Sequence, residues 1–70
     1  MRFERVDGLL VDPIEAGAIE LQLQDTLGFY VEVSESGKYF DVDLEKHGIE
    51  LQVVQSAIDQ SVYRLAKSNE

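Results

Sequence analysis

The chain has 70 residues, of which 14 are acidic and six are basic, so its formal charge is −8, and it contains no cysteine. The charge opposes binding to nucleic acid or to anionic lipid. The missing cysteines exclude disulfides, thiolate nucleophiles and cysteine-ligated metal sites. A chain this short has room for one small core and little for a deep pocket beside it, which argues against an enzyme.

The same composition favours a single cytoplasmic domain, residues 1–70. Small secreted domains usually depend on disulfides, and this chain has none. The charged start Met1-Arg2-Phe3-Glu4-Arg5 lacks the apolar stretch of a signal peptide. No apolar run approaches the roughly 20 residues that a membrane-spanning helix needs. We therefore expect no membrane association.

The N-terminal part of the chain admits two interpretations. Val6-Asp7-Gly8-Leu9 is typical of a tight turn between two short strands, which would form an N-terminal hairpin. Asp12-Pro13-Ile14-Glu15 resembles the start of a helix, with a capping aspartate followed by proline. A helix over 13–27 would place Leu21 and Leu23 about 200° apart and so would have a poor apolar face. We therefore expect one turn at 13–17 and then a strand.

Alternating apolar and polar residues predict three strands, over 19–24, 29–34 and 39–45. The links at 25–28 and 35–37 each contain a glycine, as tight reversals favour. Links this short join antiparallel neighbours, because a parallel crossover needs about a dozen residues or more. The pattern predicts a three-stranded antiparallel meander.

A helix is predicted over 51–66. Apolar residues recur there at spacings of three and four, at Leu51, Val54, Ile58, Val62 and Leu65. Gly48 marks a break before it, and Arg64 suits the negative end of a helix dipole. The predicted fold class is α+β, with this helix packed across one face of the meander.

The polar residues of the three strands would then share the opposite, exposed face of the sheet. No Lys or Arg occurs between Arg5 and Lys38, so this face is expected to be acidic. Tyrosine is enriched at binding surfaces, which suits a docking role. The alternative is a solvated face whose tyrosines are there because tyrosine favours strands. The predicted partner-binding residues are Glu20, Tyr30, Glu32, Tyr39, Asp41, Asp43 and Glu45.

Asp41, Asp43, Glu45 and His47 alternate, so a regular strand would project all of them from one side. Their oxygens suit hard cations, but a flat strand holds alternate side chains about 6.5–7 Å apart, too far for one ion. His47 is the only histidine, and no serine lies in a Gly-x-Ser-x-Gly nucleophile motif that it could activate. We predict no metal, no cofactor and no catalytic residue.

The sequence thus predicts a non-catalytic adaptor or inhibitor that docks its acidic face on a basic protein surface. In the sharpest form the carboxylates replace phosphates and block a nucleic-acid-binding site. Small acidic phage inhibitors of host defence nucleases are similar in size and charge, an analogy of composition alone. The alternative is a structural subunit that forms a homodimer or larger assembly through sheet edges or helices.

Overall fold

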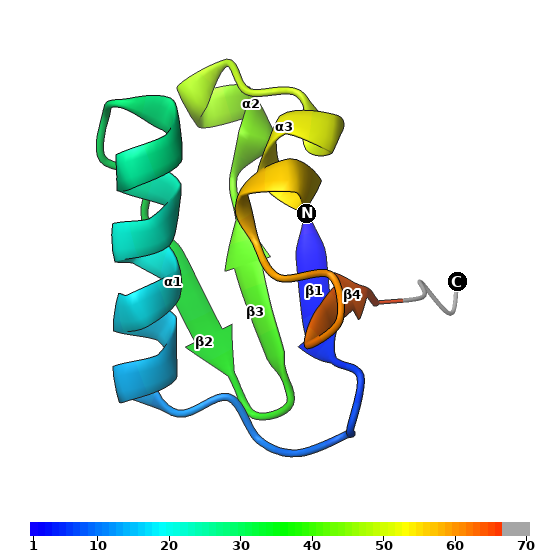
Figure 1. Ribbon diagram of the computed structural model, residues 1–70. Coiled ribbons are helices and arrows are strands. Elements are labelled where there is room, and N and C mark those ends of the chain that lie inside the picture. The colour runs from blue at the N-terminus through cyan, green and yellow to red at the C-terminus, as the bar shows by residue number, and fades with distance from the viewer. Residues whose placement is uncertain (67–70) are drawn as a thin grey trace.

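The structure, a computed structural model, describes residues 1–66 (Figure 1). Its strands are β1 (Arg2–Arg5), β2 (Val33–Ser36), β3 (Tyr39–Val42) and β4 (Tyr63–Leu65), and its helices are α1 (Pro13–Leu27), α2 (Leu44–His47) and α3 (Leu51–Ala57). The strands form one antiparallel sheet in the order β2-β3-β1-β4. In this split β-α-β arrangement, β3 lies between β1 and β2, the two strands that α1 connects. The α+β class is confirmed, but the three-stranded meander with a single helix is not.

The predicted strand over 19–24 is wrong, because this segment belongs to α1. The side chain of Asp12 accepts a hydrogen bond from the Glu15 amide at 2.7 Å and so caps the helix, whose first residue is a proline. Gly28 ends the helix in the left-handed conformation, at φ 84°, which glycine adopts without strain. The residues that start and end the helix therefore outweigh the alternation of apolar and polar residues between them.

The inner face of α1 is narrow. Ala16, Ile19 and Leu23 are buried at spacings of three and four, whereas Leu21 remains 65% exposed. The alternation of Ile19, Leu21 and Leu23, which suggested a strand, therefore mixes two faces of one helix. The helix lies beside β2 and packs against α3.

The reversal predicted at 35–37 exists as the β2–β3 hairpin, but its turn lies at 37–38, because Glu35 and Ser36 belong to β2. Val33 pairs with Val42 and Ser36 with Tyr39, and Gly37 takes φ 63° in the turn. Both strands are shorter than predicted. Residues 29–32 form a link from α1 to β2, and β3 ends at Val42 because the next residue caps α2.

The helix predicted over 51–66 is correct only in its first half. Helix α3 ends at Ala57, and the backbone of Ile58 is already extended, at φ −98° and ψ 160°. The side chain of Asp59 then accepts hydrogen bonds from the backbone N–H and the hydroxyl of Ser61, at 3.0 and 2.6 Å. This turn leads into β4, so in the second half of the apolar stripe Ile58 follows the helix, Val62 lies in the turn and Leu65 lies on a strand.

Strand β1 lies inside the sheet, between β3 and β4, so the N-terminal hairpin at Val6–Leu9 does not form. The Phe3 ring stacks on that of Phe40 at 5.2 Å, and Phe40 meets Tyr63 edge to face at 5.3 Å. The helices cover this face of the sheet (Figure 1). The buried apolar residues are Phe3, Val11, Ala16, Ile19, Leu23, Val31, Val33, Phe40, Val42, Val54, Ala57 and Ile58. Within residues 1–66, no helix is long and apolar enough to cross a membrane.

Candidate functional site

The exposed face of the sheet carries both signs of charge, so the expectation of an uninterrupted acidic face is wrong. The guanidinium of Arg2 on β1 donates to both oxygens of Asp41 on β3, at 3.1 and 3.3 Å. It also lies over the Tyr39 ring, 5.1 Å from its centroid. Asp41 raises the pKa of Arg2 through these hydrogen bonds. Tyr39 and Asp41 are therefore engaged within the protein.

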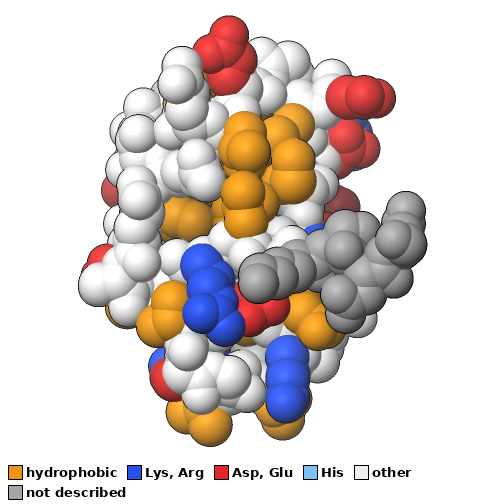
Figure 2. Space-filling view, turned by 90° about the vertical axis from the view of Figure 1, so that its right-hand side faces the viewer, with side chains coloured by type: hydrophobic (Ala, Val, Ile, Leu, Met, Phe, Trp, Pro, Cys, Tyr) orange, Lys and Arg blue, Asp and Glu red, His pale blue; other side chains and the backbone are white. Residues whose placement is uncertain are grey.

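A second ion pair lies further along the same face. The side chain of Arg64 on β4 donates to Glu4 on β1, with a shortest distance of 3.0 Å. On the side of the molecule that carries β4, Figure 2 shows Lys and Arg side chains close to Asp and Glu side chains. Such exposed pairs contribute little stability, but they remove the excess of negative charge from this part of the surface.

Negative charge concentrates instead where β2 and β3 meet α2. A hollow of about 190 Å³ lies there, and we call its acidic residues Glu32, Asp41 and Asp43 the acidic corner. The other residues that line the hollow are Ser34, Lys46 and His47. The structure thus brings together three of the predicted partner-binding residues.

The acidic corner is built by local structure as well as by charge. The side chain of Asp43 accepts a hydrogen bond from the Lys46 amide at 3.0 Å and caps α2. Its carboxylate is thereby held at the end of β3, and it stays exposed. Glu32 is also exposed, and it makes no side-chain hydrogen bond within the described part of the chain. Glu32 is therefore the carboxylate of the corner with the most freedom to contact a partner.

His47 lines the same hollow, and its Nε2 atom is buried without a hydrogen-bond partner among residues 1–66. A buried polar atom without a partner costs about 1–3 kcal/mol. The row of alternating ligands does not exist, because β3 ends at Val42, Asp43 caps α2, and Glu45 and His47 lie on α2. Among the described residues, no three Asp, Glu, His or Cys side chains are placed to hold a metal ion.

Glu20 and Tyr30 lie outside the acidic corner. The Glu20 carboxylate projects from α1 and accepts hydrogen bonds from the Tyr30 hydroxyl at 3.0 Å and from the Val33 amide at 2.9 Å. The bond to Glu20 raises the pKa of Tyr30. Because Val33 begins the edge strand β2, Glu20 satisfies a backbone group at the open edge of the sheet. Glu45, exposed on α2, does not line the hollow either.

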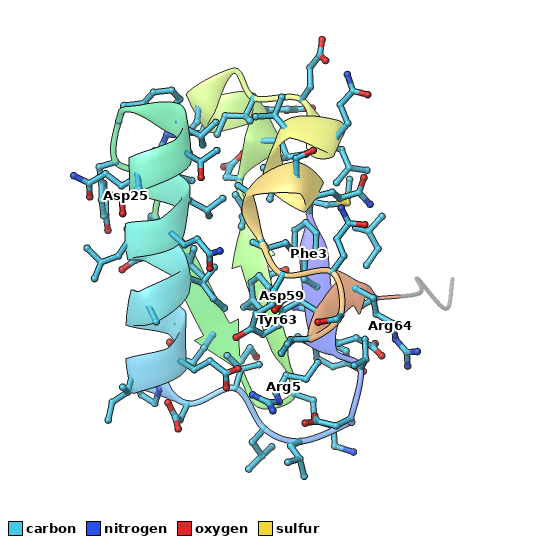
Figure 3. The ribbon with its side chains drawn as sticks, in the orientation of Figure 1. Phe3, Arg5, Asp25, Asp59, Tyr63 and Arg64 are labelled. Carbon is cyan, nitrogen blue, oxygen red and sulfur yellow. The ribbon has the colours of Figure 1, made fainter. Side chains whose placement is uncertain are left out.

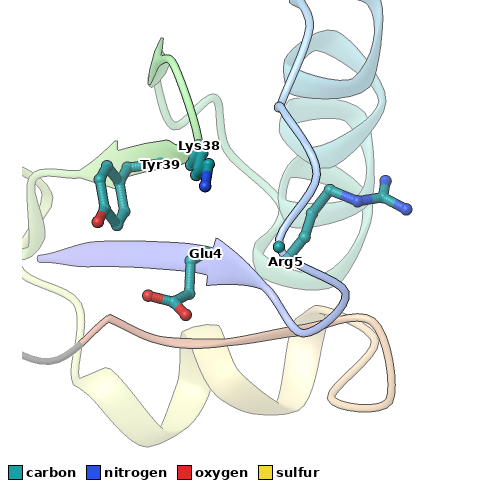
Figure 4. A pocket seen from close by; sticks show the side chains of 5 residues that line it. Glu4, Arg5, Lys38 and Tyr39 are labelled. Carbon is teal, nitrogen blue, oxygen red and sulfur yellow. The ribbon is translucent and has the colours of Figure 1, made fainter.

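A second hollow, also of about 190 Å³, lies beside the hairpin turn (Figure 4). Glu4 and Tyr39 line it from neighbouring strands, together with Lys38, and the guanidinium of Arg5 points away towards α1. Its lining has one acidic residue, Glu4, and two basic residues, Arg5 and Lys38, so it offers no excess of negative charge to a basic ligand. It is the weaker candidate.

Arg5 belongs to a network that the sequence did not reveal. Its guanidinium pairs with Glu15 on α1 and, at 2.6 Å, with Asp7, whose pKa Arg5 lowers to about 2. The Tyr63 hydroxyl donates to the same Glu15 oxygen at 2.6 Å. Figure 3 shows Arg5 and Tyr63 between the sheet and the lower turns of α1. The network joins β1, α1 and β4, so we assign it to folding.

Comparison of the chain with protein-family models, with curated proteins and with solved structures gives no match. The split β-α-β arrangement hosts many unrelated functions, so it selects none of them. The chemistry of the acidic corner and the surfaces around it is therefore what bears on function.

Proposed function

We propose that the protein is a non-catalytic binding module that docks its acidic corner on a basic surface of a protein partner. The observation that carries the proposal is the convergence of Glu32, Asp41 and Asp43 on one hollow of a molecule with charge −8. Among the described residues, the lining sets these three carboxylates against Lys46 and His47. The excess of negative charge favours an Arg or Lys side chain of the partner as its occupant.

The carboxylates of the corner suit recognition better than catalysis. General acid–base catalysis needs a carboxyl group in an environment that tunes its proton affinity, commonly by burial. Asp43 is exposed and engaged as a helix cap, and Asp41 is paired with Arg2. A concentrated acidic surface speeds the encounter with a basic partner and rejects polyanions.

The test removes charge from the corner without disturbing the fold. Glu32→Gln combined with Asp43→Asn removes two negative charges, and Asn retains the ability to cap α2. The matched control, Glu35→Gln combined with Glu50→Gln, removes the same charge from exposed positions outside the hollow. Asp41 is left unchanged because its substitution would leave Arg2 without its ion-pair partner.

A partner is first captured at low salt and purified, and its binding to each variant is then measured by surface plasmon resonance. The corner variant should bind more than tenfold more weakly, mainly through slower association, and the difference should shrink as salt is added. The control should stay within about threefold of the parent. Equal losses in both variants would mean that total charge, rather than the corner, sets the affinity.

In the finer form of this proposal the partner is a nucleic-acid-binding protein whose site the corner blocks, as a phage-type inhibitor of host defence would do. Carboxylates would then occupy positions that phosphates take in the nucleic-acid complex. Duplex DNA should compete with the protein for the captured partner, and the corner variant should be displaced at lower DNA concentration. Simultaneous binding of DNA and protein would refute this form while leaving the docking proposal in place.

A further inference from the structure

Helix α1 has a second apolar face, turned away from the core. Ile14 is 85% exposed and Leu21, two turns later, is 65% exposed. Ala18 lies between them and is also exposed. At about 100° per residue these positions fall on one side of the helix, opposite the buried Ile19 and Leu23 stripe. A surface helix usually presents polar residues there. We call Ile14, Gly17, Ala18 and Leu21 the outer face of α1.

Gly17 is the second unusual feature of this face. Glycine inside a helix costs about 1 kcal/mol relative to alanine. A Cβ atom added at Gly17 would meet nothing within 4 Å, so packing within the described structure does not require glycine. A missing side chain does allow another backbone to approach closely. Gly17 and the exposed apolar residues therefore both suit contact with a second molecule.

The charge around the outer face indicates what kind of molecule this is. Helix α1 contains no Lys or Arg. Of its carboxylates, Glu15 pairs with Arg5, and Glu20 accepts hydrogen bonds from Tyr30 and the Val33 amide, so Asp25 is the one left for a partner within the described helix. Asp12 caps one end, and Asp25 lies near the other, on the side turned away from α3 (Figure 3). A second copy of the chain would bring another charge of −8 against this surface. A basic partner would instead place Lys or Arg beside the acidic ends of the helix.

The partner segment should itself be helical. The backbone groups of α1 are hydrogen-bonded within the helix, so its surface offers no partners to the open backbone of an extended segment. A helix brings its own hydrogen bonds and presents apolar residues every three or four positions. We propose that the outer face of α1 docks an amphipathic helix of a basic partner protein. This inference rests on the proposed function only in taking the partner to be basic.

A synthetic helix of about five turns serves as the probe. It carries leucines on one face and lysines on the rest, and a scrambled peptide of the same composition breaks the leucine stripe. Fluorescence anisotropy of the labelled peptides at low salt gives the affinity for each variant. The parent protein should bind the amphipathic peptide at least tenfold more tightly than the scramble, which carries the same charge. Equal affinity for the two peptides would overturn the inference.

Two substitutions test the outer face directly. Ile14→Gln combined with Leu21→Gln keeps the charge and uses a good helix former, and it should weaken peptide binding at least tenfold. Gly17→Leu should weaken binding as strongly without lowering the melting temperature, since a Cβ atom at this position meets nothing within 4 Å and leucine is a better helix former than glycine. The control Val6→Gln combined with Leu9→Gln removes exposed apolar side chains outside α1 and should bind like the parent.

The remaining outcomes separate this inference from the proposed function. If Glu32→Gln with Asp43→Asn abolishes peptide binding while the outer-face variants bind normally, the acidic corner is the docking site and the outer face is not. If the parent sediments as a dimer that Ile14→Gln with Leu21→Gln dissociates, a second copy covers the face and the inference is overturned. If only the outer-face variants lose peptide binding, the outer face is the docking site for the helix. The role of the acidic corner is then decided by the charge-removal variants described above.

Discussion

The hydrogen bond from Tyr63 to Glu15 joins the last strand of the sheet to the first turn of α1, and Tyr63→Phe removes it. The change keeps the ring that meets Phe40 edge to face at 5.3 Å. The Glu15 side chain is only 15% exposed, so water does not readily replace the lost donor. A bond to a charged group contributes about 1.5–3 kcal/mol, and the lower value applies because Arg5 still pairs with Glu15. The melting temperature should fall by about 6–12 °C.

Thermal and urea unfolding followed by circular dichroism measure this loss, with Tyr39→Phe as the matched control. The Tyr39 hydroxyl makes no hydrogen bond within residues 1–66, so its removal should change the free energy of unfolding by less than about 0.5 kcal/mol. Equal effects of the two substitutions would show that the bond to Glu15 contributes nothing to stability.

The same bond gives the stability a defined dependence on alkaline pH. Burial, followed by the hydrogen bond to Glu15, raises the pKa of Tyr63 to about 12, whereas a tyrosine in an unfolded chain titrates near about 10. The folded state therefore holds this proton more tightly. Its contribution is complete below about pH 10 and is lost as the pH rises towards 12. The stability difference between the parent and Tyr63→Phe should narrow over that interval.

Two further substitution pairs test the fold. Gly28→Ala should destabilise the protein by about 1 kcal/mol, because φ is 84° at the end of α1. Gly17→Ala, inside the helix, should instead stabilise it by about 0.4–1 kcal/mol. Chemical denaturation measures both changes in the free energy of unfolding, and changes of the same sign would contradict the helix assignment. Ile58→Asp should unfold the domain, because it buries an unpaired carboxylate at a position only 5% exposed. Ile58→Val should cost only about 0.5–1.5 kcal/mol, and an aspartate variant that melts like the valine variant would show that Ile58 lies outside the core.

Local signals in the sequence predicted some elements well. They failed where pairing between strands that are distant in the chain determines the secondary structure. The hairpin around Gly37 and the start of α3 follow from turn residues and helical spacing. At Ile58 the apolar spacing continues while the chain leaves the helix. The short run Asp59-Gln60-Ser61, with an aspartate that can bond two residues ahead, was the overlooked turn signal.

The charge pattern of the sheet could not be predicted from local sequence. Arg2 and Asp41 are 39 positions apart in the chain, and they meet because β1 inserts between β3 and β4. The same insertion places Glu4 opposite Arg64. By contrast, the corner carboxylates Glu32 and Asp43 flank a hairpin that local rules do predict. The part of the candidate site that flanks the hairpin could therefore be predicted from the sequence, whereas the pairing of Asp41 with Arg2 could not.

Glu20 shows how a residue assigned to one role can have another. The alternating pattern placed it on an exposed strand face, but it reaches from α1 to the Val33 amide at the open edge of β2. Unsatisfied amides at a sheet edge are templates for pairing with another chain. Glu20→Ala should therefore cost about 1 kcal/mol through the lost bond to the amide and should increase self-association. Glu20→Gln keeps an acceptor at the same reach and should restore most of the parent's behaviour. Sedimentation velocity over a range of concentrations measures the association, and an alanine variant that sediments like the parent would show that Glu20 does not protect the edge.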